Sequence, residues 1–245
     1  MNTKKKSTAK KGLAIAAVLL VCVMAIGGTI AWLTSSSKLE NTFTVGLIKP
    51  VDPNKPGPGG KDPIPEGDKD PAAGKLNGNL YEPSWVKDSK LLPGIEVEKD
   101  PYVGVGPGSE KSYVYVYVKN SMKNNEHIYF TINAGWEAVK ADTVSGQPTQ
   151  YTGGLFKYSA GLDGSSNEGN TWTTNPLFSK VVVAEAANAQ DFVDSSVDLP
   201  KLDGSDKLGS ITVQSFVHQM NDTKGTPIDE NGVVLPAAKE AFGIQ

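Results

Sequence analysis

The segment Ser112–Val118, which reads SYVYVYV, limits the fold of this chain more than any other stretch. Its side chains alternate with a period of two, so an extended backbone carries the valines on one face and the tyrosines on the other. β-Branched and aromatic residues both favour strands. The pattern therefore predicts a central strand, whose tyrosine face is either covered by another layer or presented outward.

Short segments with the same alternation recur along residues 80–217, separated by turn residues such as those of 106–109. The 3.6-residue spacing of a helix is scarce in this region. Repeated short strands between turns are typical of a β-sandwich, so we predict an all-β fold. The other alternating segments are Ile95–Val97, Tyr102–Val105, Ile128–Ile132, Leu155–Tyr158, Val181–Val183 and Ile211–Val217.

Two stretches favour short helices. Ala184–Phe192 is rich in helix formers and would cross one edge of the sandwich. Pro236–Phe242 begins with the proline that suits a first helical turn, and Gly243 follows it as a stop signal. We expect one or two short helices with structural roles.

Residues 1–31 have the order of an export signal. Five lysines precede an unbroken apolar run from Leu13 to Ile26, and small residues then lead to Ala31. The run is shorter than the roughly 20 apolar residues that a membrane-spanning helix needs. We therefore predict a signal peptide cleaved between Ala31 and Trp32, with a membrane anchor as the alternative.

A strand pattern lies just beyond the predicted cleavage site, in residues 32–48. Over Leu39–Ile48 the apolar residues Phe43, Val45 and Leu47 alternate with threonines and a glycine, as in a half-buried strand. We expect a mobile strand that pairs either with its own domain or with the sheet of another subunit. In the second case Phe43, Val45 and Leu47 are the donor side chains.

Residues 49–75 contain seven prolines among glycines and charged residues, with almost nothing to bury. This composition predicts an extended, disordered linker. Residues 76–245 then form the β-sandwich domain.

The charge of the chain excludes some partners. Removal of residues 1–31 takes away five of the 24 basic residues and no acidic one, so the net charge changes from −3 to −8. Such a surface repels nucleic acid and anionic lipid, and membrane contact is expected only through the uncleaved signal peptide. The cleaved chain has no cysteine, and its 214 residues are enough for a core without disulfides.

The stretch GGTIAWLTSSSKLENTFTVGLI, residues 27–48, resembles the amino-terminal signature of the camelysin/TasA family of exported Gram-positive proteins. The Ala31-Trp32 pair and the Asn41–Gly46 sequence match that signature, while Ser35–Ser37 replace the acidic residues often found there. Lys99–Asn120 and Ile211–Met220 also resemble segments of this family.

The resemblance implies a β-sandwich of jelly-roll type and processing by a SipW-type signal peptidase. It also implies a secreted, extracellular or cell-surface location and self-association into fibres of a biofilm matrix. Camelysin-like relatives are classed as metalloendopeptidases, so the resemblance carries an enzymatic alternative as well.

Catalytic motifs are missing from the sequence. It has no His-Glu-x-x-His motif, no phosphate-binding glycine loop and no nucleophile elbow. The two histidines, His127 and His218, with Glu126 as a third ligand, would suffice for a zinc site. The alternative, which we favour, is that both histidines are hydrogen-bonded side chains near strand ends, with no metal or other cofactor.

Residues 163–174 imitate the oxygen spacing of a calcium loop. Glu168 stands where that loop requires glycine, and Thr174 stands where it requires a bidentate glutamate. We therefore expect a flexible turn.

Two functions remain open from the sequence. The first is a secreted structural subunit of extracellular fibres or biofilm matrix, with donor-strand exchange as a mode of assembly. The second is a camelysin-like metalloendopeptidase at the cell surface. The missing metal motif favours the structural function. A signal-anchored surface protein is a third alternative, and the chain lacks a Leu-Pro-x-Thr-Gly sorting signal for covalent wall attachment.

Overall fold

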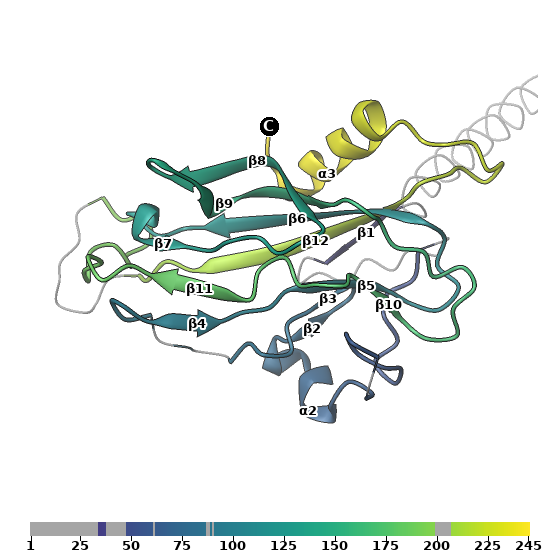
Figure 1. Ribbon diagram of the computed structural model, residues 1–245, viewed down its shortest axis with the longest axis horizontal. Coiled ribbons are helices and arrows are strands. Elements are labelled where there is room, and N and C mark those ends of the chain that lie inside the picture. Colours follow the sequence, from purple (N-terminus) through teal and green to yellow (C-terminus); the bar gives the residue numbers. More distant parts are fainter. Residues whose placement is uncertain (1–33, 38–47, 61, 87–88, 90, 199–206) are drawn as a thin grey trace, which may run out of the picture.

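The computed structural model describes residues 34–37 and 48–245, apart from 61, 87–88, 90 and 199–206. These residues form an all-β protein with a few short helices, which confirms the predicted fold class at that level (Figure 1). The described strands belong to three antiparallel sheets. One five-stranded sheet faces the two smaller sheets across a shared apolar core (Figure 1).

The five-stranded sheet has the predicted central strand in its middle. Its order is β1 (Thr34–Ser37), β12 (Ile211–Gln219), β6 (Ser112–Asn120), β9 (Gln147–Tyr158) and β8 (Trp136–Val144). β12 pairs with β6 over its full length, from Ile211 opposite Asn120 to Gln219 opposite Ser112. The SYVYVYV segment therefore lies between two long neighbours, as its alternation predicted.

The two smaller sheets form the opposite layer. One contains β10 (Thr171–Trp172), β5 (Tyr102–Val105), β3 (Leu80–Tyr81) and β2 (Leu76–Asn77), and the other contains β4 (Glu96–Glu98), β11 (Lys180–Val183) and β7 (Ile128–Tyr129). The strands predicted over residues 95–217 occur here or in the large sheet, although the one expected over Ile128–Ile132 is shorter. Phe130 forms only a single bridge, to Tyr151.

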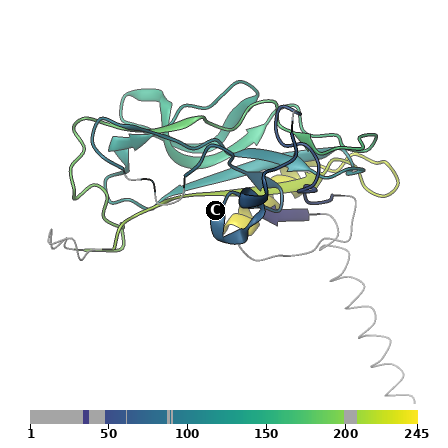
Figure 2. The ribbon, with the colours of Figure 1, turned by 90° about the horizontal axis from the view of Figure 1, so that it is seen from below.

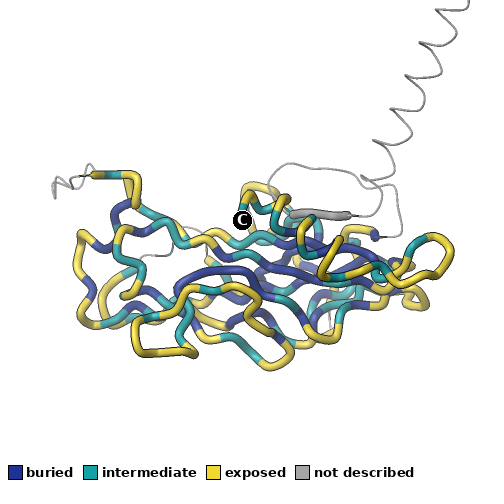
Figure 3. The backbone as a smooth tube through the Cα atoms, turned by 90° about the horizontal axis from the view of Figure 1, so that it is seen from above, coloured by how far each residue is buried: buried dark blue, intermediate teal, exposed yellow. Residues whose placement is uncertain are grey.

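The valine face of β6 forms the centre of the core. Val114, Val116 and Val118 are almost completely buried and belong to one cluster with Val103 of β5 and Val181 of β11. Figure 3 shows buried stretches of the chain running through the interior of the protein. Burial of these side chains supplies the main favourable contribution to folding, because each removes apolar surface from water.

The tyrosine face of β6 is covered by the carboxyl-terminal residues. One turn of π-helix, η3 (Glu230–Val234), continues into α3 (Leu235–Phe242), which lies over the large sheet (Figure 1). Val234 and Ala238 are fully buried against Tyr115 and its neighbours in a second apolar cluster. The structure thus selects the first of the two alternatives for this face.

Of the two predicted helices, only the carboxyl-terminal one is present. α3 has its proline in the first turn, and Gly243 ends it with a left-handed φ of 68°. The helix expected over Ala184–Phe192 was wrong, because this segment forms turns. The side chain of Asn188 accepts a hydrogen bond from the amide of Gln190, and such local bonds compete with a helix.

The Pro-rich segment 49–75 differs from the expected disordered linker. It contains turns and the short helices α2 (Glu66–Lys69) and η1 (Pro71–Ala73), and its Val51 and Ile64 are buried. Figure 2 shows this dark-blue part of the chain lying against the body of the protein.

Long-range contacts hold the Pro-rich segment in place. The indole nitrogen of Trp172 donates to the carbonyl of Pro56 at 3.0 Å, and Asn170 exchanges two hydrogen bonds of 2.8 Å with the backbone of Asp52. The prolines lack an amide hydrogen but keep their carbonyl acceptors. Composition could not reveal the donors for these carbonyls, because they lie more than a hundred residues away in the sequence.

β8 was not predicted from the sequence. Its residues are mostly exposed and polar, so the alternation that marks a half-buried strand is missing. The β8–β9 pairing is also irregular, with register shifts between Ala138 and Lys140. Gly154 of β9 has a φ of 125°, and a Cβ there would lie 2.4 Å from the Cα of Ala141, so this close approach requires glycine.

Candidate interaction site

Within the described residues, the outer edge of β12 is only partly covered. Among the described residues, β1 pairs with β12 over Ser215–His218, and no strand pairs with the outer edge of Ile211–Gln214. We call Ile211–Gln214 the open edge. A strand edge of this kind presents backbone donors and acceptors to another strand.

The opposite edge of the large sheet is protected. β8 is interrupted by the register shifts near Lys140 and carries exposed polar side chains along most of its length. Bulges and lysines on an edge strand discourage pairing with other chains. The two edges of the same sheet therefore differ in their ability to accept a strand.

A cavity of about 740 Å³ lies beside the open edge, because Ile211 and the two residues before it form part of its lining. The other walls come from the β3–β4 connection, from β4 and β11, and from the segment that precedes β12. Its apolar lining includes Trp85, Leu91, Met122, Val181, Phe192 and Leu208. Leu92 and Leu208 are 55% and 68% exposed, so the cavity opens onto a surface with unburied apolar groups.

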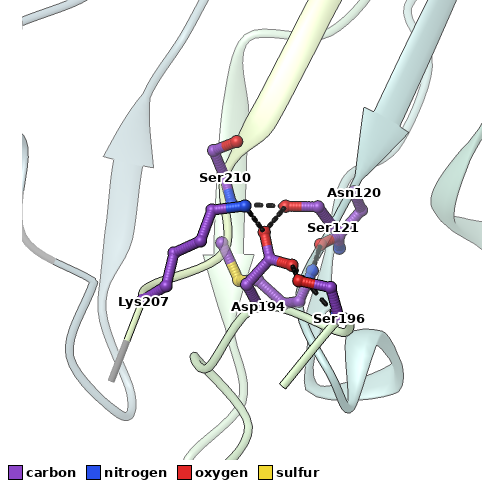
Figure 4. A network of polar contacts seen from close by, with 7 residues as sticks. Asn120, Ser121, Asp194, Ser196, Lys207 and Ser210 are labelled. Carbon is purple, nitrogen blue, oxygen red and sulfur yellow. Dashed lines mark hydrogen bonds and ion pairs between the residues drawn. The ribbon is translucent and has the colours of Figure 1, made fainter. Parts of the chain in front are cut away.

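A polar network stabilises the rim of this cavity where the chain enters β12 (Figure 4). Asp194 accepts hydrogen bonds from the amide and hydroxyl of Ser196, at 3.0 and 2.5 Å, and lies 3.1 Å from the Nζ atom of Lys207. Ser121, at the end of β6, donates to Asp194 and accepts from the amide of Ser210 at 2.9 Å. The network thus ties the two segments around Asp194 and Ser210 to the central strand.

The charge of Asp194 is stabilised within this network. The hydrogen bonds from Ser196, together with Lys207, hold the pKa of the carboxyl well below its usual range. The group is therefore a carboxylate at any pH where the protein is expected to work.

A buried ion pair forms part of the cavity wall. Lys99 lines the cavity, and its Nζ atom lies 2.8 Å from Oε2 of Glu82. The side chains are only 10% and 7% exposed. The same ammonium lies 5.0 Å from the ring centre of Trp85, so it faces an aromatic surface as well as a carboxyl group.

The candidate zinc ligands do not come together. His218 on β12 lies opposite Tyr113, at one end of β6, whereas the residues around His127 lie at the other end, where Ile128 accepts a hydrogen bond from Asn120. Seven residue steps along β6 separate these ends by roughly 23 Å. In the described part of the chain, no group of three His, Cys, Asp or Glu side chains is arranged to hold a metal ion.

Both histidines have other partners. Nδ1 of His127 lies 2.7 Å from Oδ2 of Asp191, while Glu126 is exposed. Burial would raise the pKa of Asp191, but hydrogen bonds from His127 and from the amide of Asn188 hold it below its ordinary value.

His218 is buried and donates from Nδ1 to the carbonyl oxygen of Gln219 at 2.8 Å. Burial lowers the pKa of this imidazole, which favours its neutral form. These contacts agree with the interpretation of the histidines as hydrogen-bonded side chains.

The first part of the calcium-like stretch, residues 163–170, consists of turns and bends, and β10 follows it. Asp163 accepts from the amide and hydroxyl of Ser165, so its carboxylate is used within the loop. The pKa of Asp163 is lowered by those hydrogen bonds.

The predicted cleavage pair, Ala31 and Trp32, and the donor side chains Phe43, Val45 and Leu47 lie outside the described residues. Of the predicted strand over residues 39–48, only Ile48 is described, and it is fully buried. Within the described residues no helix is long and apolar enough to cross a membrane.

Sequence reasoning missed the open edge, the cavity and both polar clusters around it. Glu82 and Lys99 are 17 residues apart, and Ser121 and Asp194 are 73 apart, with no motif that links either pair. Comparison of the chain with protein-family models, with curated proteins and with solved structures finds no match.

Proposed function

We propose that this protein is an exported structural subunit of extracellular fibres or biofilm matrix, whose copies associate by strand addition at the open edge. The observation that carries the proposal is that no described strand pairs with the outer edge of Ile211–Gln214, which lies beside an apolar cavity. Export and processing at Ala31–Trp32 by a SipW-type peptidase, and a fold of jelly-roll type, are parts of the proposal that rest on the family resemblance.

The register of β1 supports a specific donor segment. Thr34 lies opposite His218 and Ser37 lies opposite Ser215 in an antiparallel pair. An incoming strand from a second copy that kept this register would set Asn41 opposite Ile211 and Phe43 opposite Gly209. Both Ile211 and Gly209 line the cavity.

The same register also supports the choice of donor side chains. Directly opposed residues of an antiparallel pair point to the same face of the sheet. Val213 and Val217 of β12 pack on the central core. In this register, odd-numbered residues of the donor strand lie opposite odd-numbered residues of β12 and share their face of the sheet. Phe43 would therefore face the cavity side, and Val45 and Leu47 would face the same side.

Strand addition draws its affinity from backbone hydrogen bonds and its specificity from alternate side chains. Transfer of one large apolar side chain such as Phe43 from water into the cavity contributes about 1.5–3 kcal/mol. The exposed Leu92 and Leu208 at this site would also be covered.

The test compares the chain that begins at Trp32 with a chain that begins at Ile48. The shorter chain keeps the buried Ile48 and loses both β1 and the donor segment. We expect only the longer chain to polymerise in light scattering and negative-stain microscopy. A synthetic peptide of residues 38–47 should bind the shorter chain and block growth of the longer one.

A pair of matched substitutions separates the two edges of the sheet. Leu208→Lys changes an exposed side chain at the cavity, and Val139→Lys changes an exposed side chain on β8. We expect the first to abolish growth and the second to leave it unchanged. Equal growth of all chains, with no peptide binding, would contradict the proposal.

The metalloendopeptidase alternative has its own test. The separation of His127 and His218 argues against a shared metal site. Purified protein should therefore leave casein intact. Casein cleavage that is lost with a chelator and on His127→Ala or His218→Ala would replace the structural function with the enzymatic one.

A further inference from the structure

The ion pair between Lys99 and Glu82 differs from the exposed pairs of this protein. Lys180 and Glu96 lie 2.6 Å apart with side chains that are 49% and 55% exposed, whereas the Lys99–Glu82 contact is almost closed to solvent. Removal of two charges from water costs free energy that their attraction only partly restores. The burial of this pair therefore needs an explanation that the exposed pairs do not.

Within the described residues, only one oxygen of the Glu82 carboxyl group has a partner. Oε2 contacts Lys99, while Oε1 is buried and has no hydrogen-bond partner there. Burial raises the pKa of Glu82, because the charged form loses its hydration. Transfer of a proton from Nζ to Oε2 across their 2.8 Å contact would give the pair in which the nitrogen is nucleophilic and the carboxyl carbon is electrophilic.

A second acid lies next to this pair. Asp100 is 9% exposed, and its Oδ1 atom accepts a hydrogen bond of 2.8 Å from the amide of Ser84. Burial also raises the pKa of Asp100, and its charge contributes to the raised pKa of Glu82. Asp100 is therefore the acid whose charge acts on this pair, and its hydrogen bond to Ser84 holds it beside the residues that follow Glu82.

We propose that Lys99 and Glu82 condense to an intramolecular amide bond. The lone pair of Nζ attacks Cδ of Glu82, so the nitrogen–carbon bond forms. One carboxyl oxygen leaves as water, and takes up the proton that the amine nitrogen releases, with Asp100 as the proton carrier. The balance is one amine and one carboxylic acid giving one amide and one water, with no oxidant or reductant.

The structure favours this product over the ion pair. Two groups held in contact react at effective concentrations far above those in solution, which offsets the reverse attack by water. A neutral amide also avoids the desolvation cost of two buried charges. The bond would close the connection between β3 and β4, which supplies Trp85 and Leu91 to the cavity wall.

The test is the mass of the purified chain under denaturing conditions. We expect a mass lower than that of the sequence by one water molecule, and the sequence mass for Lys99→Arg, which keeps the positive charge. Digestion with a lysine-specific protease should fail after Lys99 and release a branched peptide that also contains Glu82. The equally close Lys180–Glu96 pair serves as the internal control and should be cleaved after Lys180.

Asp100→Asn tests the proton carrier, because it keeps the size of the side chain. We expect condensation about a hundredfold slower, seen as uncrosslinked chain in freshly purified protein. Equal condensation in this variant would overturn the role of Asp100.

A full sequence mass and a free Lys99 in the folded wild-type protein would overturn the bond itself, as would a water loss that maps to another residue. The wild-type peptide map decides the question even if Lys99→Arg fails to fold.

Discussion

Tyr115, in the middle of the central strand, donates a hydrogen bond from its hydroxyl to Oε1 of Glu230, with 2.6 Å between the two oxygens. The carboxylate of Glu230 also lies 2.7 Å from Nζ of Lys157 on β9. Burial and the contact with Glu230 raise the pKa of the Tyr115 hydroxyl, so it remains a donor. This cluster connects the carboxyl-terminal helical segment to the strand on which the large sheet is built.

Tyr115→Phe should destabilise the protein by about 1.5 kcal/mol, because it removes one partly buried hydrogen bond to a charged group. Chemical denaturation measures the change in the free energy of unfolding. Tyr113→Phe is the matched control on the same face of β6, where Tyr113 contacts Lys157 through its ring. A change below about 0.5 kcal/mol is expected for the control. Equal effects of the two variants would mean that the Glu230 contact is not what stabilises this face.

Asn170→Ala should release the Pro-rich segment from the body of the protein. The side chain of Asn170 makes the two hydrogen bonds to Asp52 and a third, of 3.3 Å, to the carbonyl of Pro56. We expect faster amide exchange and faster proteolysis within residues 49–64, with little change in the large sheet. Asn167→Ala is the control, because Asn167 bonds only within its own loop and to Thr171. Unchanged protection of the segment in Asn170→Ala would contradict this assignment.

His218 should make the stability of the fold depend on pH below neutrality. Burial lowers the pKa of His218 in the folded state, so the unfolded chain binds a proton first as the pH falls below about 6.5. Stability is then present above the unfolded pKa and is lost as the pH falls toward the folded pKa. The slope from this group is at most about 1.4 kcal/mol per pH unit. Denaturation curves between pH 8 and pH 5, about one unit apart, should show the slope in the wild type and a smaller one in His218→Asn. Identical slopes would exclude His218 as the source.

Asp194→Ala should loosen the cavity rim without unfolding the sheet. The substitution removes the acceptor for Ser196 and the partner of Lys207, while the Ser121–Ser210 hydrogen bond remains. We expect faster amide exchange at residues 193–197 and weaker binding of the 38–47 peptide. Asp222→Ala provides the control, because Asp222 accepts comparable hydrogen bonds in a turn after β12. If both variants bind the peptide as tightly as the wild type, the rim does not contribute to the site.

The strands of the large sheet show where sequence periodicity is informative. In β6 the valines face one apolar cluster and the tyrosines face another, so the alternating sequence pattern reflects burial on both faces of the strand. The sequence of β8 shows no alternating pattern, because most of its side chains are exposed to water. An exposed edge strand is under no constraint to alternate, and its sequence is that of a polar loop.

The candidate site was less accessible to sequence reasoning than the fold. The sequence predicted a donor strand from the alternation of Phe43, Val45 and Leu47. This strand remains a prediction, because these residues lie outside the described part of the chain. The acceptor edge, Ile211–Gln214, could not be predicted from the sequence. The edge at Ile211–Gln214 is known from the described pairing of β1 with Ser215–His218, and the position of a neighbouring strand has no signature in the sequence of β12 itself.

The sequence by itself determined the all-β class, the central strand and the carboxyl-terminal helix with its glycine stop, because each depends on local periodicity or local backbone preference. Only the tertiary structure decided that the Pro-rich segment packs on the body, that His127 and His218 lie apart, and that Lys99 meets Glu82 inside a cavity wall. The physical reason is that these features depend on contacts between residues distant in the chain, and the free energy of such contacts is set by burial and by partners that no local pattern specifies.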